Sequence, residues 1–291
     1  MPKNASKPKS EYAIQTVANA LRMLEVFNDE AEIGVSDLAR RLDLHKNNAF
    51  RLLATLEIAG YIQQDPSTEL YQLGPRCLEL GHSFARSHSL MQQARPILEG
   101  LAEATGETAH LGILSGDEVV HLDGMLPDQR VLCATRVGER ADAHCTALGK
   151  ALLAGRIHHG GVLETRAASD GADGKRAAGP SWSVSDPTGL QRPPQDGKLA
   201  RHTSATVEDA SKLAEELRTV GLRGYATDLE EYSRGLHCVA ASVRDNSARV
   251  VAALSLSGPS FRLGEAELHG SAARAISEAA LQLSICLGAT L

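Results

Sequence analysis

The sequence predicts an α+β protein in which a small, mainly helical domain precedes a larger domain built around a largely antiparallel sheet. Three observations support this prediction. Residues 35–56 contain two short apolar-periodic segments joined by a tight turn, the pattern of two packed helices. Two short segments of strand-forming residues follow directly. Beyond residue 91, helical segments are interspersed with strands connected by short turns, which is typical of the α+β class.

The stretch 35–56 organises the first domain as a helix-turn-helix. Its apolar residues give each helix one inward stripe, and these residues are Leu38, Leu42, Leu44, Ala49 and Leu52. Ser36 is expected to cap the first helix by accepting a backbone N–H. Asp43 lies in the turn, where a left-handed residue is usually needed, and Asp tolerates that conformation better than most residues.

The second helix of this motif is expected to bury Ala49, Leu52, Leu53 and Leu56. Its outer face then carries donors and acceptors suited to base edges and phosphates in a DNA major groove. The residues expected to contact DNA are Ser36, Arg40, Lys46, Asn47, Asn48, Arg51 and Thr55. The alternative is an ordinary helical hairpin with a solvated polar face. The strands expected at 61–65 and 69–73 form a hairpin, the wing of a winged helix, and favour DNA binding.

The charge distribution restricts how DNA could be bound. The chain of 291 residues has a net charge of −6, and residues 1–75 contain eight Lys/Arg against ten Asp/Glu. This balance counts against strong non-specific DNA binding. Within residues 35–56, four basic residues stand against two acidic ones, so the positive charge is local and a dimer would present it twice.

The segments around this motif complete the first domain. Residues 1–11 are polar and are expected to form a disordered tail, so the DNA-binding domain is expected at 12–75. A first helix is expected to pack behind the motif through Val17, Leu21, Leu24 and Phe27. A linker helix is expected within 76–90, and its apolar residues are Leu78, Leu80 and Phe84. They could pack on their own domain or pair with another subunit.

The second domain is expected at 91–291. Its predicted helices are 92–105, a helix from Thr146 through 153, 210–220 and 265–286, and its predicted strands are 110–114, 118–122, 131–137, 224–227, 236–243 and 249–257. Thr206 with Asp209 forms a weak capping box, and Gly221 is the expected helix stop. Residues 156–195 lack periodicity and are rich in Gly, Ala, Ser and Pro, so we expect a flexible insertion there.

Cysteine usage and hydropathy indicate a cytoplasmic protein. The five cysteines are odd in number and far apart, and no C-x-x-C occurs, which fits reduced thiols. The N-terminus has no apolar core of a signal peptide. The longest apolar run, residues 250–254, is too short to span a membrane, so no membrane association is expected.

Four further motifs occur in the second domain. They are HCTALGKALLA at 144–154, GYATDLEE at 224–231, GLHCVAA at 235–241 and VAALSLSGP at 251–259. With the helix-turn-helix, they make the chain resemble the IclR family of bacterial transcription regulators over residues 12–287. The resemblance implies an N-terminal winged helix, a C-terminal effector-binding domain of GAF-like shape, a small-molecule effector, and assembly as a dimer or tetramer on double-stranded DNA. The segment 156–195 is longer than is usual for the family.

The resemblance also implies which residues line the effector pocket. They are Ala147, Leu148, Asp228, Cys238, Ser255 and Ser257. The residues themselves agree in part, because Ser255 and Ser257 face one side of a strand and a helix N-terminus at Ala147 is an anion site. We therefore expect a small organic acid. Two serines that bond each other in a small core are the alternative, and Asp228 would repel an anion unless it caps a loop or is protonated.

Two other classes of function are alternatives. Cys145 and Cys238 each follow a histidine, as in an enzyme with a thiolate nucleophile. Neighbouring residues on a strand point to opposite faces, so neither His-Cys dipeptide is its own catalytic pair, although His144 with Cys238 stays open. A purely structural interaction protein leaves the polar helix face unexplained. No cofactor and no metal site are expected, because Gly149-Lys150 lacks the rest of a phosphate loop and the histidines lack ligand spacing.

Overall fold

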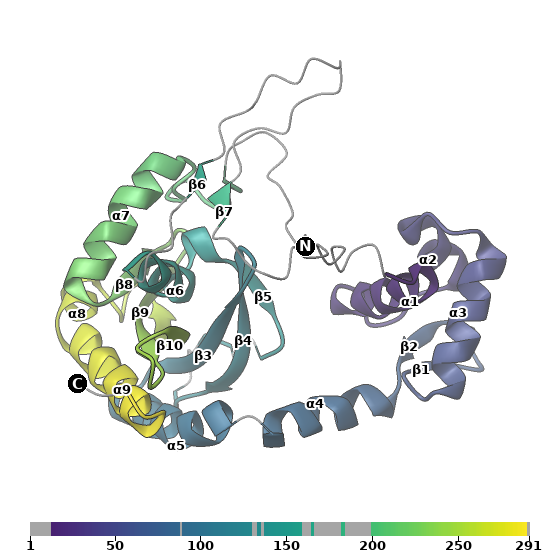
Figure 1. Ribbon diagram of the computed structural model, residues 1–291, viewed down its shortest axis with the longest axis horizontal. Coiled ribbons are helices and arrows are strands. Elements are labelled where there is room, and N and C mark those ends of the chain that lie inside the picture. The colour runs from purple at the N-terminus through teal and green to yellow at the C-terminus, as the bar shows by residue number, and fades with distance from the viewer. Residues whose placement is uncertain are drawn as a thin grey trace, which may run out of the picture. The chain divides into compact units, whose positions relative to one another are not determined.

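The computed structural model describes residues 13–87, 89–129, 133–134, 137–158, 164–165, 182–183 and 199–289 (Figure 1). The chain divides into two compact units, Met1–His88 and Ser89–Leu291. Each unit has its own core of buried apolar side chains. In the described part of the chain, no helix is long and apolar enough to cross a membrane.

The first unit contains the helix-turn-helix and a hairpin. Its elements are α1 (Gln15–Glu25), η2 (Val26–Asn28), α2 (Val35–Leu42), α3 (Lys46–Ile58), β1 (Ile62–Gln64), β2 (Tyr71–Leu73) and α4 (Pro75–Ser87). Asp43 has the expected left-handed conformation, with φ of 53° and ψ of 48°, and its N–H closes the end of α2. Strands β1 and β2 pair antiparallel, and Ile33 adds a further bridge to Tyr71.

Two expectations about this unit need correction. The expected stripe on the first helix is buried only in part, because Phe27 is buried and Leu24 packs against the core, whereas Val17 is 53% exposed and Leu21 is 57% exposed. Met23 is buried instead, and Phe27 lies in the η2 turn. Ser36 does not cap α2, because the helix begins at Val35 after Gly34 and no side chain bonds its first turn. The core is formed instead around Met23, Leu38, Ala49, Leu53 and Ile62.

The second unit is built on a six-stranded antiparallel sheet. Its strands are β3 (Thr108–Ser115), β4 (Glu118–Met125), β5 (Arg140–Asp142), β8 (Ala226–Leu229), β9 (Leu236–Arg244) and β10 (Val250–Pro259). The spatial order is β5-β4-β3-β10-β9-β8, so the central pair β3–β10 joins segments far apart in the sequence.

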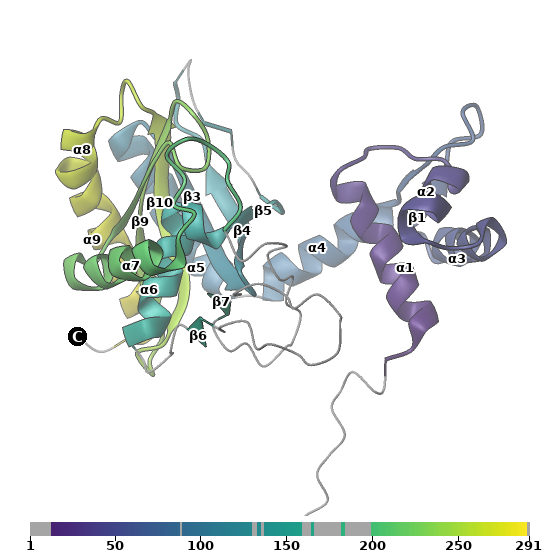
Figure 2. The ribbon, with the colours of Figure 1, turned by 90° about the horizontal axis from the view of Figure 1, so that it is seen from above.

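Helices cover both faces of this sheet (Figure 2). They are α5 (Ser89–Thr105), α6 (Ala147–His158), α7 (Ala210–Arg223), α8 (Glu265–His269) and α9 (Ser271–Cys286), and a short turn η3 (Ala143–Cys145) precedes α6. Successive strand residues alternate between faces. Thus Val239 and Leu254 pack with α5 and α9, whereas Cys238 and Ala253 lie in the cluster with α6 and α7.

Several expected boundaries in the second unit need correction. Asp209 caps α7 by accepting the N–H groups of Ser211 and Lys212, and Thr206 does not. Gly224, with φ of 86°, ends α7 in place of Gly221, which lies inside the helix. The C-terminal helix is interrupted at Gly270, which separates α8 from α9.

Two expected segments fall largely outside the described residues. Of the strand expected at 131–137, the described residues 133–134 and 137 are not in a strand, and the strand that pairs with β4 is β5. Of the expected insertion 156–195, helix α6 extends to His158, and β6 (Glu164–Thr165) pairs antiparallel with β7 (Trp182–Ser183). The rest of that segment lies outside the described residues.

Candidate functional site: a helix-turn-helix face and an effector cavity

The outer face of α3 carries the side chains that the sequence analysis assigned to DNA contact. Ala49 and Leu53 are buried, and Leu52 and Leu56 are half-buried against the same core. The opposite face is therefore left to solvent, and its exposed residues include Lys46, Asn47, Asn48, Arg51 and Thr55. Asn47 and Arg51 are one helical turn apart, so their side chains project side by side.

The contacts of this motif are local. Arg40 on α2 forms an ion pair with Asp37 at 2.7 Å, and both side chains are more than half exposed. Such exposed pairs contribute little stability, so the guanidinium can exchange partners with a phosphate. The Thr55 hydroxyl donates to the Arg51 carbonyl oxygen at 2.8 Å. Ser36 is exposed on the first turn of α2.

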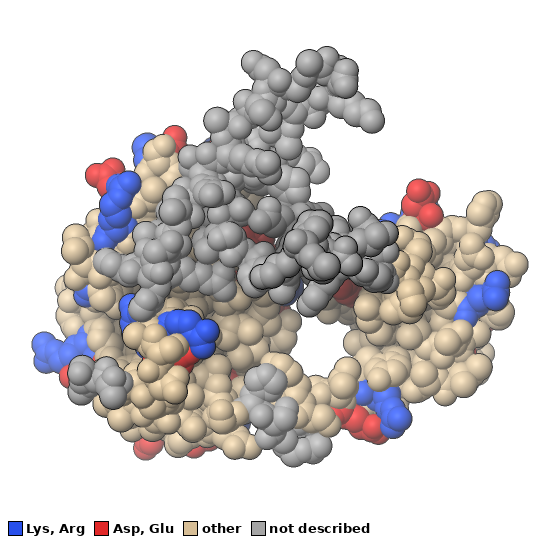
Figure 3. Space-filling view, in the orientation of Figure 1, with Lys and Arg blue, Asp and Glu red and all other residues tan. Residues whose placement is uncertain are grey.

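The first unit also exposes apolar residues that the sequence analysis did not assign to this face. Phe50 on α3 is 53% exposed. On the face shown in Figure 3, Lys and Arg side chains are scattered and form no single patch. Since residues 1–75 contain eight Lys/Arg against ten Asp/Glu, binding by this unit would rest on a few placed contacts more than on bulk charge.

The second unit contains a cavity of about 380 Å³, open mouth included, between the sheet and the start of α6. It is lined by His110, His121, Cys133, Ala141, Thr146, Leu148, Asp228, Tyr232, Leu236, Cys238, Ser255 and Ser257. Five of the six expected pocket residues are among them. Ala147 is the exception, because it is buried in the core beside the cavity and does not line it.

The strand register explains why these residues meet. Asp228 on β8 lies opposite Cys238 on β9, and Cys238 lies opposite Ser257 on β10. Two residues before Ser257 on the same strand, Ser255 lies opposite His110 on β3. Both serines are buried, and within the described residues neither hydroxyl has a hydrogen-bond partner. The alternative in which the two serines satisfy each other is therefore wrong.

The start of α6 closes this cavity with backbone donors. Thr146 caps the helix, because its hydroxyl oxygen accepts the Gly149 N–H at 3.2 Å and its carbonyl accepts the Lys150 N–H at 2.9 Å. The N–H groups of Ala147 and Leu148 belong to the first turn of α6 and so have no acceptor within the helix. A Cβ on Gly149 would come within 2.2 Å of the Ala143 backbone, so only glycine lets α6 pack this closely on η3.

Asp228 caps the loop that follows β8. Its Oδ1 accepts the N–H groups of Glu231 at 2.7 Å and Tyr232 at 3.4 Å. The side chain is 1% exposed. Burial raises the pKa of the Asp228 carboxyl to about 6, against the lowering effect of Lys150 and the two N–H groups.

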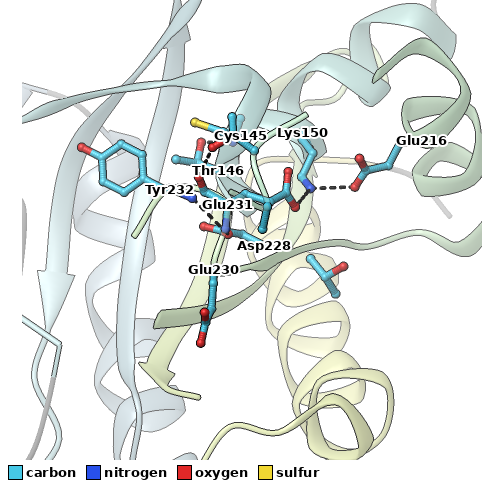
Figure 4. A network of polar contacts seen from close by, with 12 residues as sticks. Cys145, Thr146, Lys150, Glu216, Asp228, Glu230, Glu231 and Tyr232 are labelled. Atoms are coloured by element: carbon cyan, nitrogen blue, oxygen red, sulfur yellow. Dashed lines mark hydrogen bonds and ion pairs between the residues drawn. The ribbon is translucent and has the colours of Figure 1, made fainter. Parts of the chain in front are cut away.

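Among the described residues, Lys150 is the largest fully buried side chain, at 0% exposure. Its Nζ contacts Glu216 Oε1 on α7 at 2.6 Å and Glu231 Oε1 at 2.5 Å (Figure 4). The two carboxylates outweigh the effect of burial and raise the pKa of Lys150, which therefore stays charged. Burial raises the pKa of Glu231 to about 7.

The two histidine–cysteine pairs do not form a nucleophile. Cys145 is fully buried, and burial followed by the nearby Asp142 raises the pKa of its thiol strongly, the opposite of thiolate activation. The His144 Nε2 lies 2.9 Å from the Ala200 carbonyl oxygen, and burial lowers the pKa of the His144 imidazole. His237 lies against the Leu263 carbonyl at 2.8 Å, whereas Cys238 lines the cavity.

One group of possible metal ligands comes together in the described part of the chain, although none was expected. One ligand atom each of Asp142, Cys145 and His202 lie within 4.8 Å of one another. Two of these three already bond each other, because His202 Nε2 lies 2.7 Å from Asp142 Oδ2.

Sequence reasoning missed four polar residues of this region. His110 and His121 line the cavity with ring centroids 5.5 Å apart, and Tyr232 lines it from the loop after β8. The fourth is Lys150, for which Gly149-Lys150 suggested only an incomplete phosphate loop. A usable signal existed for Lys150, because a single lysine inside the apolar run 147–154 must find a buried partner.

These features define a class of protein, a helix-turn-helix regulator with a separate ligand-binding domain. Comparison with family models agrees: residues 16–66 match the IclR helix-turn-helix domain, and residues 82–159 and 183–285 match the bacterial transcriptional regulator IclR C-terminal domain. The chain belongs to the IclR family of bacterial transcriptional regulators. It is therefore a DNA-binding regulator with a C-terminal effector-binding domain, and its relatives are regulators and not enzymes.

Individual relatives cover nearly the whole chain. The HTH-type transcriptional regulator XynR of Escherichia coli is 33% identical over 276 residues, covering 94% of this chain and 98% of XynR. BhcR of Paracoccus denitrificans is 32% identical, covering 93% of this chain and 86% of BhcR. The solved regulator from Alicyclobacillus acidocaldarius shares the fold, with a TM-score of 0.73 at 24% identity, covering 94% of this chain and 99% of that one.

The family models leave residues 160–182 unmatched, within the segment expected as an insertion. An IclR homologue from Microbacterium hydrocarbonoxydans was solved in complex with 4-hydroxybenzoate. It has a TM-score of 0.70 and 24% identity, covering 94% of this chain and 98% of that one.

Proposed function

We propose that this regulator binds double-stranded operator DNA as a dimer or tetramer and senses a small organic acid in the cavity beneath α6. The observation that carries the effector assignment is the pair of buried hydroxyls, Ser255 and Ser257, which face this cavity without protein partners in the described residues. We divide the chain into a DNA-binding domain at 12–75, a linker helix at 76–90 and an effector-binding domain at 91–291. As a DNA-binding regulator it is proposed to act in the cytoplasm.

The DNA contacts are proposed to divide by role. Asn47 and Arg51 lie at the centre of the exposed α3 face, where side chains reach base edges. The remaining contacts would position the helix on the backbone, and they are Ser36, Arg40, Lys46, Asn48 and Thr55.

The oligomer is proposed to form in part through α4. Leu78 is 66% exposed and Leu80 is 61% exposed, and Phe84 is exposed on the same helix. Several exposed apolar side chains on one helix are typical of a surface that contacts a second subunit. A single recognition helix also rarely gives enough specificity alone, so a pseudo-palindromic operator is expected.

Light scattering is expected to show the mass of a dimer or a tetramer of the 30.9 kDa chain. Replacing Leu78 and Leu80 together by glutamate should weaken the oligomer and reduce operator affinity. The control is Leu222→Glu, because Leu222 is 85% exposed in the other unit. A wild-type monomer that binds one half-site as tightly as the full operator would contradict this proposal.

The effector is proposed to place its carboxylate at the start of α6. The N–H groups of Ala147 and Leu148 and the partial positive charge of the helix end favour an anion. Ser255 and Ser257 then donate hydroxyl hydrogens, and Leu148, Leu236 and Cys238 supply apolar walls. A few convergent polar groups in an apolar cavity are usual for small-molecule sites. Effector binding changes the affinity for operator DNA only if the protein has two subunit arrangements that differ in their affinity for the effector.

Calorimetry with a panel of acids, amines and neutral aromatics tests this assignment, with 4-hydroxybenzoate as the first probe. Ser255→Val replaces one hydroxyl by an apolar side chain that is one heavy atom larger, and the loss of one hydrogen bond to a charged group is about 1.5–3 kcal/mol, or roughly 10- to 150-fold in Kd. Ser247→Val, at an exposed turn far along the same hairpin, is the control. Tight binding of amines or neutral compounds alone would reject the acid, and an unaffected Ser255→Val would reject the site.

A further inference from the structure

The cavity borders a cluster of buried charges that do not balance. The single ammonium of Lys150 contacts the carboxylates of Glu216 and Glu231, at 2.6 Å and 2.5 Å. The carboxylate of Asp228 lies beside them and is bonded to the Glu231 N–H (Figure 4). Three carboxylates thus lie around one ammonium, which contacts two of them directly. Lys150 and Asp228 are almost completely buried, so water compensates little of the excess negative charge.

Asp228 is the carboxylate of this cluster that a ligand in the cavity would contact. It lines the cavity, whereas Lys150, Glu216 and Glu231 do not. Its direct partners are two backbone N–H groups, and the ammonium contacts the other two carboxylates. A carboxylate bound at the start of α6 would therefore enter the same small space as a second, only partly compensated carboxylate. Two such anions repel, and protonation of one removes the repulsion.

We propose that the cavity binds an organic acid as its anion together with one proton, and that Asp228 takes up this proton from solvent. Protonated Asp228 then changes from an acceptor into a hydroxyl donor toward the bound carboxylate. The inference rests on the proposed function, because it concerns an acid in this cavity. It makes Asp228 the residue that selects anionic acids over amines as the pH falls.

The pKa of Asp228 in the protein without ligand supports this proposal. The pKa of Asp228 is raised to about 6 in the cavity without ligand, so this carboxyl is mostly ionised at neutral pH yet close to titration. A neighbouring anion raises the pKa further. Over the interval between the pKa of the free site and that of the complex, binding takes up a proton, and affinity for the anion falls as pH rises.

Other titratable groups surround Asp228, and the test must separate them from it. They are Lys150 on α6, Glu216 on α7, Glu231 and Tyr232 on the loop after β8, Cys238 on β9, His110 on β3, His121 on β4 and Cys145 on η3. The histidines are the serious rivals, since an imidazole that gains a proton would also strengthen acid binding at low pH.

The experiment is calorimetry of the full chain with 4-hydroxybenzoate and lactate between pH 5.5 and 8.5. Each pH is repeated in buffers of different ionisation enthalpy, because the slope of binding heat against that enthalpy counts the protons taken up. We expect about one proton at pH 7.5 and about a quarter of a proton at pH 5.5, from the pKa of about 6. Kd should rise by up to about tenfold per pH unit above pH 6. The uncharged 4-hydroxybenzamide should take up none.

Asp228→Asn imitates the protonated side chain and retains an oxygen for the Glu231 N–H. This variant should bind the acids with a Kd that does not change between pH 6 and 8, and without proton uptake. Asp123→Asn is the matched control, because Asp123 is a buried carboxylate on β4 that pairs with Arg95 and does not line the cavity. It should take up protons as the wild type does.

The outcomes separate the two proposals. Acids that bind with the same Kd from pH 5.5 to 8.5, without buffer-dependent heat, would overturn only the proton uptake. Uptake that persists in Asp228→Asn but disappears in His110→Asn or His121→Asn would also overturn it, in favour of a histidine. If no acid binds at any pH, the proposed acid effector is wrong and this inference falls with it.

Discussion

Arg51→Ala is expected to weaken specific operator binding while leaving the fold intact. Arg51 is exposed on α3, and no buried contact depends on its side chain. Loss of one good base contact should weaken binding by roughly 1–3 kcal/mol, about 5- to 150-fold. The same range applies to Asn47→Ala. Gel shifts with operator DNA in excess competitor, beside circular dichroism of each variant, measure both properties.

Arg51→Lys is the informative companion to Arg51→Ala. Lysine keeps the charge but cannot make the planar two-point contact that arginine makes with a guanine edge. Arg51→Lys should therefore remain defective in specific binding. Wild-type affinity in Arg51→Lys would show that Arg51 binds a phosphate, and wild-type affinity in Arg51→Ala would assign sequence reading to another element, such as the wing.

Lys150→Met is expected to destabilise the effector-binding domain by about 3–5 kcal/mol near pH 8, because it leaves buried carboxylates without their cation. The two carboxylates that lose their contact are Glu216 and Glu231. Urea unfolding followed by circular dichroism measures the loss. Lys212→Met is the control, because Lys212 is exposed on α7, and it should change stability by no more than about 0.5 kcal/mol.

The loss in Lys150→Met should shrink as the pH falls toward 5. Burial raises the pKa of Glu231 from 4.5 to about 7 even with Lys150 present, and without the ammonium it would rise further. A carboxyl whose pKa is higher in the folded than in the unfolded protein destabilises the fold once it ionises. This cost in unfolding free energy is small near pH 4.5, the unfolded pKa, and reaches its full value above the folded pKa. The double variant Lys150→Met, Glu231→Gln should recover part of the loss at pH 8. Equal losses at pH 5 and 8 would contradict this explanation.

Much of the first unit could be predicted because helical periodicity separates buried from exposed residues locally. The outer face of α3 and the left-handed Asp43 follow from spacing and turn chemistry alone. The buried side of α1 could not be read in this way, because Val17, Leu21, Met23 and Leu24 offer two apolar faces. Which face is buried depends on the helices that pack against it.

The cavity of the second unit shows a similar division. Ser255 and Ser257 could be placed on one side of a strand from their spacing, and Thr146 could be identified as a helix cap. The contribution of His110 depends on β3 pairing with β10, whose sequence lies far away. The partners of Lys150 are 66 and 81 residues distant, so no local pattern predicts them.

The cavity draws its polar groups from strands β3, β4, β8, β9 and β10 and from the start of α6, which are spread along the chain but adjacent in space. No partly unfolded form of this domain that has lost one of these elements retains the whole site. A ligand that occupies the cavity therefore binds the folded domain alone, and at a hundred times its Kd it should raise the free energy of unfolding by about 2.7 kcal/mol. The melting temperature of the purified chain thus becomes a direct screen for its unknown effector, with no need for the operator sequence.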